Sequence, residues 1–216
     1  MKTLGSTARI IPGFLVKSEQ EFLERLKKFE GLTNHIHIDV MDGVFVPNTT
    51  WADAEVIERL LPKQMTYELH LMVKDPLPFM KAHASRHWTR FVLHVESNHD
   101  VAPFLLEAKR QGKEVFLAIN PETPLEMATK HTNEINGILV MGNDPGFSGR
   151  PLNEKVTLQR LRKLVREYSD LKLSVDVGVN AKTAPKLREA GATELISTSY
   201  LTLTEDVAGA IQSLKQ

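Results

Sequence analysis

Short apolar runs rich in Val, Ile and Leu alternate eight times with longer stretches of helical period along this chain. Strands that alternate with helices indicate a parallel sheet, because parallel neighbours need a long crossover between them. The predicted strands lie at about residues 8–16, 35–41, 66–73, 90–96, 114–120, 137–142, 172–179 and 194–200. The predicted helices lie at about residues 18–30, 52–61, 77–86, 100–111, 124–132, 152–169, 181–190 and 205–215.

Eight such units in 216 residues give 216/8 = 27 residues per unit, which fits a compact (β/α)8 barrel. A doubly wound open sheet is the alternative for the same alternation. The barrel is favoured because no Gly-x-Gly-x-x-Gly follows the first strand and polar residues stand near the carboxyl ends of many strands. No linker or charge block divides the chain, so we expect a single-domain α/β TIM barrel over residues 1–216.

The amino-acid composition limits the classes of partner that this protein is expected to bind. Lys and Arg total 27 and Asp and Glu total 27, so the chain lacks the basic footprint of a nucleic-acid-binding protein. No stretch of 18 apolar residues and no signal peptide is found, which predicts no membrane partner and a soluble, cytoplasmic protein. Cysteine is absent, so disulfides and thiolate metal ligands are excluded.

Polar side chains interrupt several of the apolar strands. His37 and Asp39 are two residues apart, so they share one strand face, and His70 and Asp176 stand in similar positions on later strands. A lone strand histidine is usually an ordinary core residue, but a polar group inside an apolar strand is costly unless something binds it. The four together form a plausible ligand set for one divalent metal ion.

The carboxylates of Asp39 and Asp176 predict acid/base chemistry. Asp39 is on the second strand and Asp176 on the seventh, so in a closed barrel they approach the axis from roughly opposite sides. Such a pair suits removal of a proton from one face of a substrate and its return to the other face. A metal between them would polarise a carbonyl or enediolate oxygen.

Other polar residues allow more than one interpretation. His94 and Glu96 are either partners of a metal ligand or a structural pair, and Asp42 is interpreted as the cap of a turn. The remaining histidines are interpreted as surface or loop residues: His35, His83, His87, His99 and His131.

Methionines and glycines near the strand ends are candidate substrate contacts. Met41, Met72 and Met141 are either core filler or a sulfur-lined floor that keeps water from a reactive intermediate. The loop 143–149 is either a mobile lid with N–H groups for an anion or an ordinary turn-rich loop. The candidate substrate-binding residues are His70, Met41, Met72, Met141, Gly146, Phe147, Ser148, Gly149, Gly178, Thr198 and Ser199.

The chain resembles the ribulose-phosphate 3-epimerases over nearly its whole length. The most specific segments are 37–48 (HIDVMDGVFVPN), 68–73 (ELHLMV) and 120–124 (NPETP), followed in family order by Met141, residues 144–147 (DPGF) and Asp176. The resemblance implies a (β/α)8 barrel that binds one divalent ion, often zinc, through His37, Asp39, His70 and Asp176. Iron, manganese or cobalt would also suit these ligands. It implies that Asp39 and Asp176 are the acid/base pair that inverts C3 of a ketose 5-phosphate, and that the protein forms dimers or larger rings.

Several positions depart from the family pattern. Gly13 stands where the family has serine, Val177 replaces the first of two glycines, and Thr198 replaces the glycine of a Gly-Ser pair. The lid reads Gly-Phe-Ser-Gly-Arg over residues 146–150 instead of Gly-Phe-Gly-Gly-Gln. Because a β-branched residue disfavours φ > 0, we expect Val177 to mark an altered backbone or a smaller anion contact. Arg150 is either a replacement charge for a phosphate or a surface arginine.

The sequence therefore predicts a metal-dependent enzyme, an isomerase that acts on a small-molecule sugar phosphate, with ribulose 5-phosphate and xylulose 5-phosphate as the first candidates. One alternative is a 3-epimerase of another sugar such as a hexulose 6-phosphate. The other is a non-catalytic descendant of the fold that binds a sugar phosphate.

Overall fold

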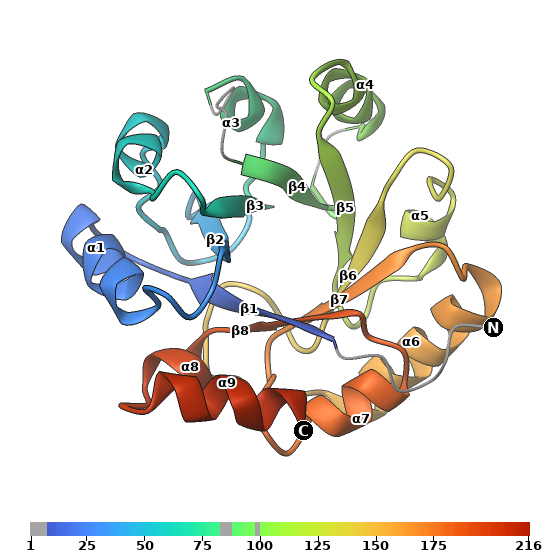
Figure 1. Cartoon of the computed structure of the whole chain (residues 1–216). Coiled ribbons are helices and arrows are strands. Elements are labelled where there is room, and N and C mark those ends of the chain that lie inside the picture. The colour runs from blue at the N-terminus through green and yellow to red at the C-terminus, as the bar shows by residue number, and fades with distance from the viewer. Residues whose placement is uncertain (1–7, 83–87, 98–99) are drawn as a thin grey trace.

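The chain forms a closed barrel of eight parallel strands in sequence order, with the helices outside it (Figure 1). The computed structural model describes residues 8–82, 88–97 and 100–216. The strands are β1 (Arg9–Phe14), β2 (His35–Met41), β3 (Thr66–Met72), β4 (Trp88–His94), β5 (Glu114–Ile119), β6 (Gly137–Met141), β7 (Lys172–Asp176) and β8 (Glu194–Ser197). The predicted (β/α)8 barrel is confirmed.

Helices follow the strands and return the chain to the start of the next strand. They are α1 (Glu19–Lys28), α2 (Ala54–Leu60), α3 (Pro76–Ala82), α4 (Ala102–Arg110), α5 (Glu126–Thr129), α6 (Glu154–Glu167), α7 (Ala184–Glu189), α8 (Ser199–Thr202) and α9 (Val207–Lys215). Local signals in the sequence fix several ends. Ser18 accepts a hydrogen bond from the Glu21 N–H at the start of α1, and Gly112 and Gly191 take positive φ just beyond α4 and α7.

The last strand ends earlier than predicted, and the predicted helix 77–86 extends beyond the described residues. The sequence predicts a last strand that reaches residue 200, but β8 ends at Ser197 and α8 begins two residues later. The chain turns there because the Thr198 carbonyl accepts hydrogen bonds from both the N–H and the hydroxyl of Thr202. The end of the predicted helix 77–86 lies outside the described residues, as do His83, His87 and His99.

Alternation along each strand separates two environments. Ile36, Ile38 and Val40 of β2 belong to the large core between the barrel and its helices. A smaller apolar cluster fills the barrel itself and includes Val92, Phe116 and Ile196. His35, His37 and Asp39 also point inward and are buried. The prediction that His35 is a surface or loop residue is therefore wrong: it lies on β2 and contacts Thr66 and Glu68.

A buried ionic layer lies inside the barrel, toward the strand beginnings. The Arg90 guanidinium forms a bidentate pair with Glu194 and lies 3.1 Å from a Glu68 oxygen. Ser174 donates to Glu194 at 2.6 Å. Burial acts to raise the pKa of Glu68, but its histidine partners and Arg90 outweigh burial and hold that pKa well below its usual range. These charges stabilise one another only as a complete set.

Val177, directly after β7, has φ of +71°, and Gly178 follows with φ of +77°. The valine therefore adopts the left-handed conformation that glycine takes more easily. Its neighbours hold it there: a Cβ on Gly142 would lie 2.1 Å from the Val177 carbonyl oxygen, so the two backbones are in close contact. Strain of this kind persists only where surrounding packing enforces it.

We predict that Arg90→Met lowers the free energy of unfolding by about 3–5 kcal/mol, because it leaves buried carboxylates without their cation. Urea denaturation checks this. Arg110→Met is the matched control, since Arg110 is exposed and pairs with Glu107 one helical turn away. Arg90→Met/Glu194→Gln should recover part of the loss. Equal stability of the Arg90 and Arg110 variants would contradict the account of this layer.

We predict that Val177→Gly is more stable than Val177→Ala by about 1 kcal/mol, because both lose the isopropyl group but only glycine relieves the left-handed strain. Thermal or urea unfolding of the two variants measures the difference. Arg162→Gly and Arg162→Ala, at an exposed position inside α6, form the control pair and should show the opposite order. The same order at both sites would mean that Val177 is not strained.

Candidate metal and sugar-phosphate site

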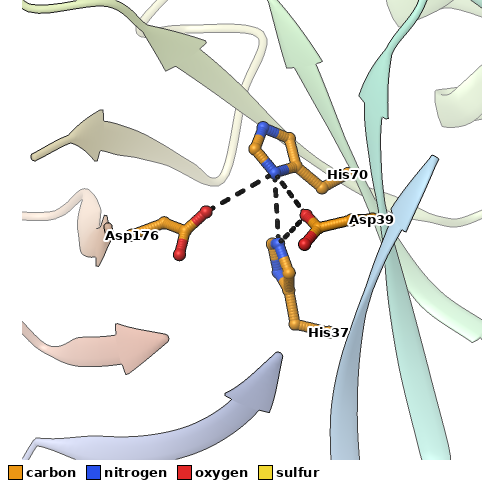
Figure 2. A group of neighbouring side chains, drawn as sticks. All are labelled: His37, Asp39, His70 and Asp176. Carbon is orange, nitrogen blue, oxygen red and sulfur yellow. Dashed lines mark hydrogen bonds and ion pairs between the residues drawn. The ribbon is translucent and has the colours of Figure 1, made fainter. Parts of the chain in front are cut away.

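Four buried side chains converge inside the carboxyl end of the barrel (Figure 2). His37 and Asp39 come from β2, His70 from β3 and Asp176 from β7. The His70 Nδ1 atom lies 3.2 Å from His37 Nε2, 3.2 Å from an Asp39 oxygen and 3.8 Å from an Asp176 oxygen. One ligand atom from each residue lies within 4.8 Å of the others. The four sequence candidates are thus brought to one place.

The second ring nitrogen of His37 is held by a carboxylate. Its Nδ1 lies 2.6 Å from Glu68 Oε1, the same carboxylate that contacts Arg90 in the ionic layer. With a proton on Nδ1 donated to Glu68, the Nε2 lone pair is directed at the cluster. A carboxylate behind a histidine commonly fixes the tautomer of a metal ligand.

His70 is oriented by a chain of polar groups. Its Nε2 lies 2.9 Å from His94 Nε2, and His94 Nδ1 lies 3.1 Å from Glu96. Glu96 in turn accepts the backbone N–H of Asn120 at 2.8 Å. When each histidine donates outward along this chain, the Nδ1 lone pair of His70 faces Asp39 and Asp176. His94 and Glu96 therefore act on His70 and are more than an isolated structural pair.

The two aspartates have opposite electrostatic environments. Burial acts to raise the pKa of Asp39, but hydrogen bonds from His37 and His70 outweigh it and hold that pKa below its usual value. Burial, followed by repulsion from Asp39, raises the pKa of Asp176. Burial acts to lower the pKa of His37, but Asp39 and Glu68 reverse this and raise it to about 10. Opposed shifts within one carboxylate pair are typical of acid/base sites.

The donor set fits a divalent cation. With both histidines neutral, two imidazole lone pairs and two carboxylates are directed at one point. Without a metal, the raised pKa of His37 means that a proton on its ring compensates part of the negative charge of the two carboxylates. Nitrogen and oxygen ligands of this kind suit zinc, iron, manganese or cobalt. The outward nitrogens of both histidines already have partners, which completes the support that metal ligands usually need.

A narrow cavity opens beside Asp39 and Asp176 at the carboxyl ends of the strands. The candidate residues that line it are Met41, Met72, Met141, Gly146, Phe147, Ser148, Gly149, Gly178, Thr198 and Ser199. His70, which was also a candidate, is absent from this lining, and its side chain is fully buried. Val177 and Pro145, which the sequence marks only as a departure from the family pattern and as part of the loop 143–149, also line it, whereas Leu15, Val179 and Ile196 were missed from the sequence. Their apolar or backbone character gives no chemical signal; only the strand-end position could have suggested them.

The methionines divide between two environments. Met41 and Met72 pack with Val46 against one wall of the cavity, and Met141 belongs to the apolar cluster inside the barrel. All three therefore pack as core residues and also line the cavity. This combines both interpretations of the sequence.

The loop after β6 covers one side of the cavity. Gly146 and Gly149 have positive φ, and the Gly146 carbonyl accepts a hydrogen bond from Asn48 at 2.6 Å. The Arg150 guanidinium pairs with Asp144 at 3.4 Å and does not line the cavity. Asp42 caps its own turn by accepting the Val44 and Phe45 N–H groups, as predicted. No described helix has the length and apolar character needed to cross a membrane.

The sequence of this chain is similar to those of known proteins. Residues 9–202 match the family described as the ribulose-phosphate 3 epimerase family. A Methanocaldococcus jannaschii protein named ribulose-phosphate 3-epimerase is 31% identical over 89% of this chain and 83% of its own length. The Bacillus subtilis protein of that name is 29% identical over 96% and 98% of the two chains.

Solved structures support the fold alone. The 3-hexulose-6-phosphate synthase from Salmonella typhimurium superposes with a TM-score of 0.72 at 16% identity, covering 96% of this chain and 97% of that one. The sequence matches carry the further conclusion that this chain belongs to the ribulose-phosphate 3 epimerase family.

Proposed function

We propose that this protein is a metal-dependent epimerase that inverts C3 of a ketose phosphate, with ribulose 5-phosphate and xylulose 5-phosphate as its substrate pair. Family membership supports an isomerase that acts on a carbohydrate phosphate. The observation that carries the proposal is the pair of aspartates from β2 and β7, which border one cavity and have opposed pKa shifts.

Proton transfer follows from these two environments. Asp39, whose pKa is lowered, is ionised and takes the C3 proton of one epimer as general base. Asp176, on the other side of the cavity and with its pKa raised by burial, acts as general acid and delivers a proton to C3 from the opposite face. The roles exchange in the reverse direction. Met41, Met72 and Met141 offer no exchangeable protons, so the intermediate is protonated by the aspartates.

A divalent ion, zinc first, is proposed to be held by His37, Asp39, His70 and Asp176. When bound, it stabilises the negative charge that develops on the substrate oxygens. Glu68 and the His94–Glu96 pair keep the two histidine lone pairs directed inward. Gly146, Gly149, Gly178 and Ser199 border the cavity where the phosphate is proposed to bind. A cytoplasmic location and assembly into dimers or rings remain predictions.

We predict that Asp39→Asn and Asp176→Asn each lower kcat by about 10²–10⁴, because each removes one partner of the proton transfer. Each single variant should exchange the C3 proton of at most one epimer. The measurement is NMR of ribulose 5-phosphate and xylulose 5-phosphate in deuterated water, with the zinc content of every variant determined.

Asp170→Asn, at an exposed position before β7, is the control and should leave turnover unchanged. A hexulose 6-phosphate tested in parallel separates the alternative sugar. A zinc-loaded wild-type protein that binds the pentulose phosphate without C3 exchange would support the non-catalytic alternative.

We predict that zinc affinity rises about tenfold per pH unit from pH 6.5 toward 8, because a raised His37 pKa means that binding must displace a proton. The stability of the metal-free protein depends on pH in the opposite direction. Its His37 contributes stability that is fully present below pH 6.5 and is lost as pH rises toward about 10. Competition titration with a chelator and thermal unfolding measure the two trends.

Glu68→Gln is the matched variant, since it removes one of the two carboxylates that raise the His37 pKa. Its zinc affinity should level off at a lower pH than that of the wild type. A zinc affinity that does not change with pH in the wild type would contradict the proposed ligand set.

A further inference from the structure

The segment 120–124 (NPETP) follows β5 and is not among the residues that line the cavity. Three of its backbone carbonyls accept hydrogen bonds from a single side chain, the guanidinium of Arg160 on α6. The Asn120 carbonyl oxygen lies 2.7 Å from one terminal nitrogen, and the Pro121 and Thr123 oxygens each lie 2.5 Å from the other. One arginine therefore fixes the shape of this loop.

The guanidinium of Arg160 is committed to the loop. Arg160 is half-buried, and it forms no ion pair with a carboxylate of the described residues. A cation that is partly removed from water needs polar partners, and here they are the neutral carbonyls of residues 120–123. The planar fork of N–H donors can serve several carbonyls at once. The Asn120 carbonyl also accepts the Thr123 N–H at 3.1 Å, so the loop is a closed turn that α6 holds.

The same loop holds Glu96. The Asn120 N–H donates to Oε1 of Glu96 at 2.8 Å, while the other carboxylate oxygen lies 3.1 Å from His94 Nδ1. Burial acts to raise the pKa of Glu96. Hydrogen bonds from His94, Thr123 and the Asn120 N–H outweigh burial and lower that pKa, so the carboxylate is ionised. One Glu96 oxygen is thus fixed by the loop and the other is directed at His94.

His94 carries this constraint to a proposed metal ligand. Its Nε2 lies 2.9 Å from His70 Nε2, and the two rings are nearly parallel, with an interplanar angle of 16°. Both imidazoles are fully buried, and Phe45 packs against His94 with ring centroids 4.9 Å apart. If Glu96 moved, the His94 ring would lose the acceptor of its Nδ1–H. The orientation of His70 would then no longer be fixed from behind.

We propose that Arg160 is a positioning residue for His70. It acts through the loop 120–123 and Glu96, which together hold His94 in place. This inference rests on the proposed function, in which His70 is a metal ligand. Arg160 itself does not line the cavity, so its contribution is the orientation of groups that stand behind the ligand. Groups that support a metal ligand change metal affinity by about 10–100-fold, and a residue farther out should act near the lower limit.

Arg160→Met should weaken zinc binding about tenfold, measured by competition with a chelator at constant pH. Arg188→Met is the matched control, because Arg188 is also half-buried, donates to a backbone carbonyl, that of Leu214, and does not line the cavity. Both variants should lower Tm, but only Arg160→Met should change zinc affinity. Wild-type zinc affinity in Arg160→Met would overturn the proposal. Arg160→Lys keeps the charge without the fork and should show a smaller loss, so it replaces Arg160→Met if that variant does not fold.

A double-mutant cycle with Glu96→Gln tests the route. If Arg160 acts through Glu96, the double variant R160M/E96Q should bind zinc about as weakly as Glu96→Gln alone. Full multiplication of the two single losses would show that Arg160 does not act through this carboxylate, which contradicts the proposal.

The metal-free protein separates this inference from the proposed function. NMR of nitrogen-labelled protein detects imidazole N–H protons that exchange slowly with water, and the wild type should show them for His70 Nε2 and His94 Nδ1. Arg160→Met should accelerate both exchanges, whereas Arg188→Met should accelerate neither. Unchanged exchange in Arg160→Met refutes this inference alone. A wild type that binds no zinc refutes the proposed function, and the exchange rates still decide whether Arg160 fixes the two rings.

Discussion

The parallel register between β2 and β3 is the constraint on which the site depends. It pairs Asp39 with His70 and His37 with Glu68, so each imidazole stands beside a carboxylate. A shift of either strand by one residue would move its two members of this set to the opposite face of the sheet and separate the pairs. Closure of the barrel then brings Asp176 on β7 to the same point from another side.

Glu68 connects the site to the rest of the barrel. One of its oxygens holds His37, and the other lies near His35 and Arg90. The orientation of a proposed metal ligand and the stability of the ionic layer therefore share one carboxylate. This explains why charged residues occupy an interior where apolar side chains would cost less. The same groups that stabilise the barrel determine which lone pairs face the cavity.

The barrel and the four-residue cluster could be predicted because both follow from periodicity: alternation gives the strands, and i, i+2 spacing gives the inward face. The same spacing could have identified His35, which shares that face with His37, but a histidine at the start of a strand resembles a loop residue.

The end of β8 was missed because local hydrogen bonds to Thr198 turn the chain. Thr198 lies close to Gly13, where an added Cβ would be 2.0 Å from the threonine hydroxyl oxygen, and this approach depends on the β1–β8 register, which no local pattern contains. The positive φ of Val177 is unusual for a β-branched residue, and its close contact with Gly142 depends on the fold rather than on the local sequence.

The central claim is that His37, Asp39, His70 and Asp176 together hold one ion between the two aspartates. X-ray absorption spectroscopy of the protein loaded with one equivalent of zinc tests it most directly. The account predicts a first shell of two imidazole nitrogens and carboxylate oxygens, with one imidazole lost in His70→Asn. A shell without imidazole scattering, or a spectrum that His70→Asn leaves unchanged, would contradict it.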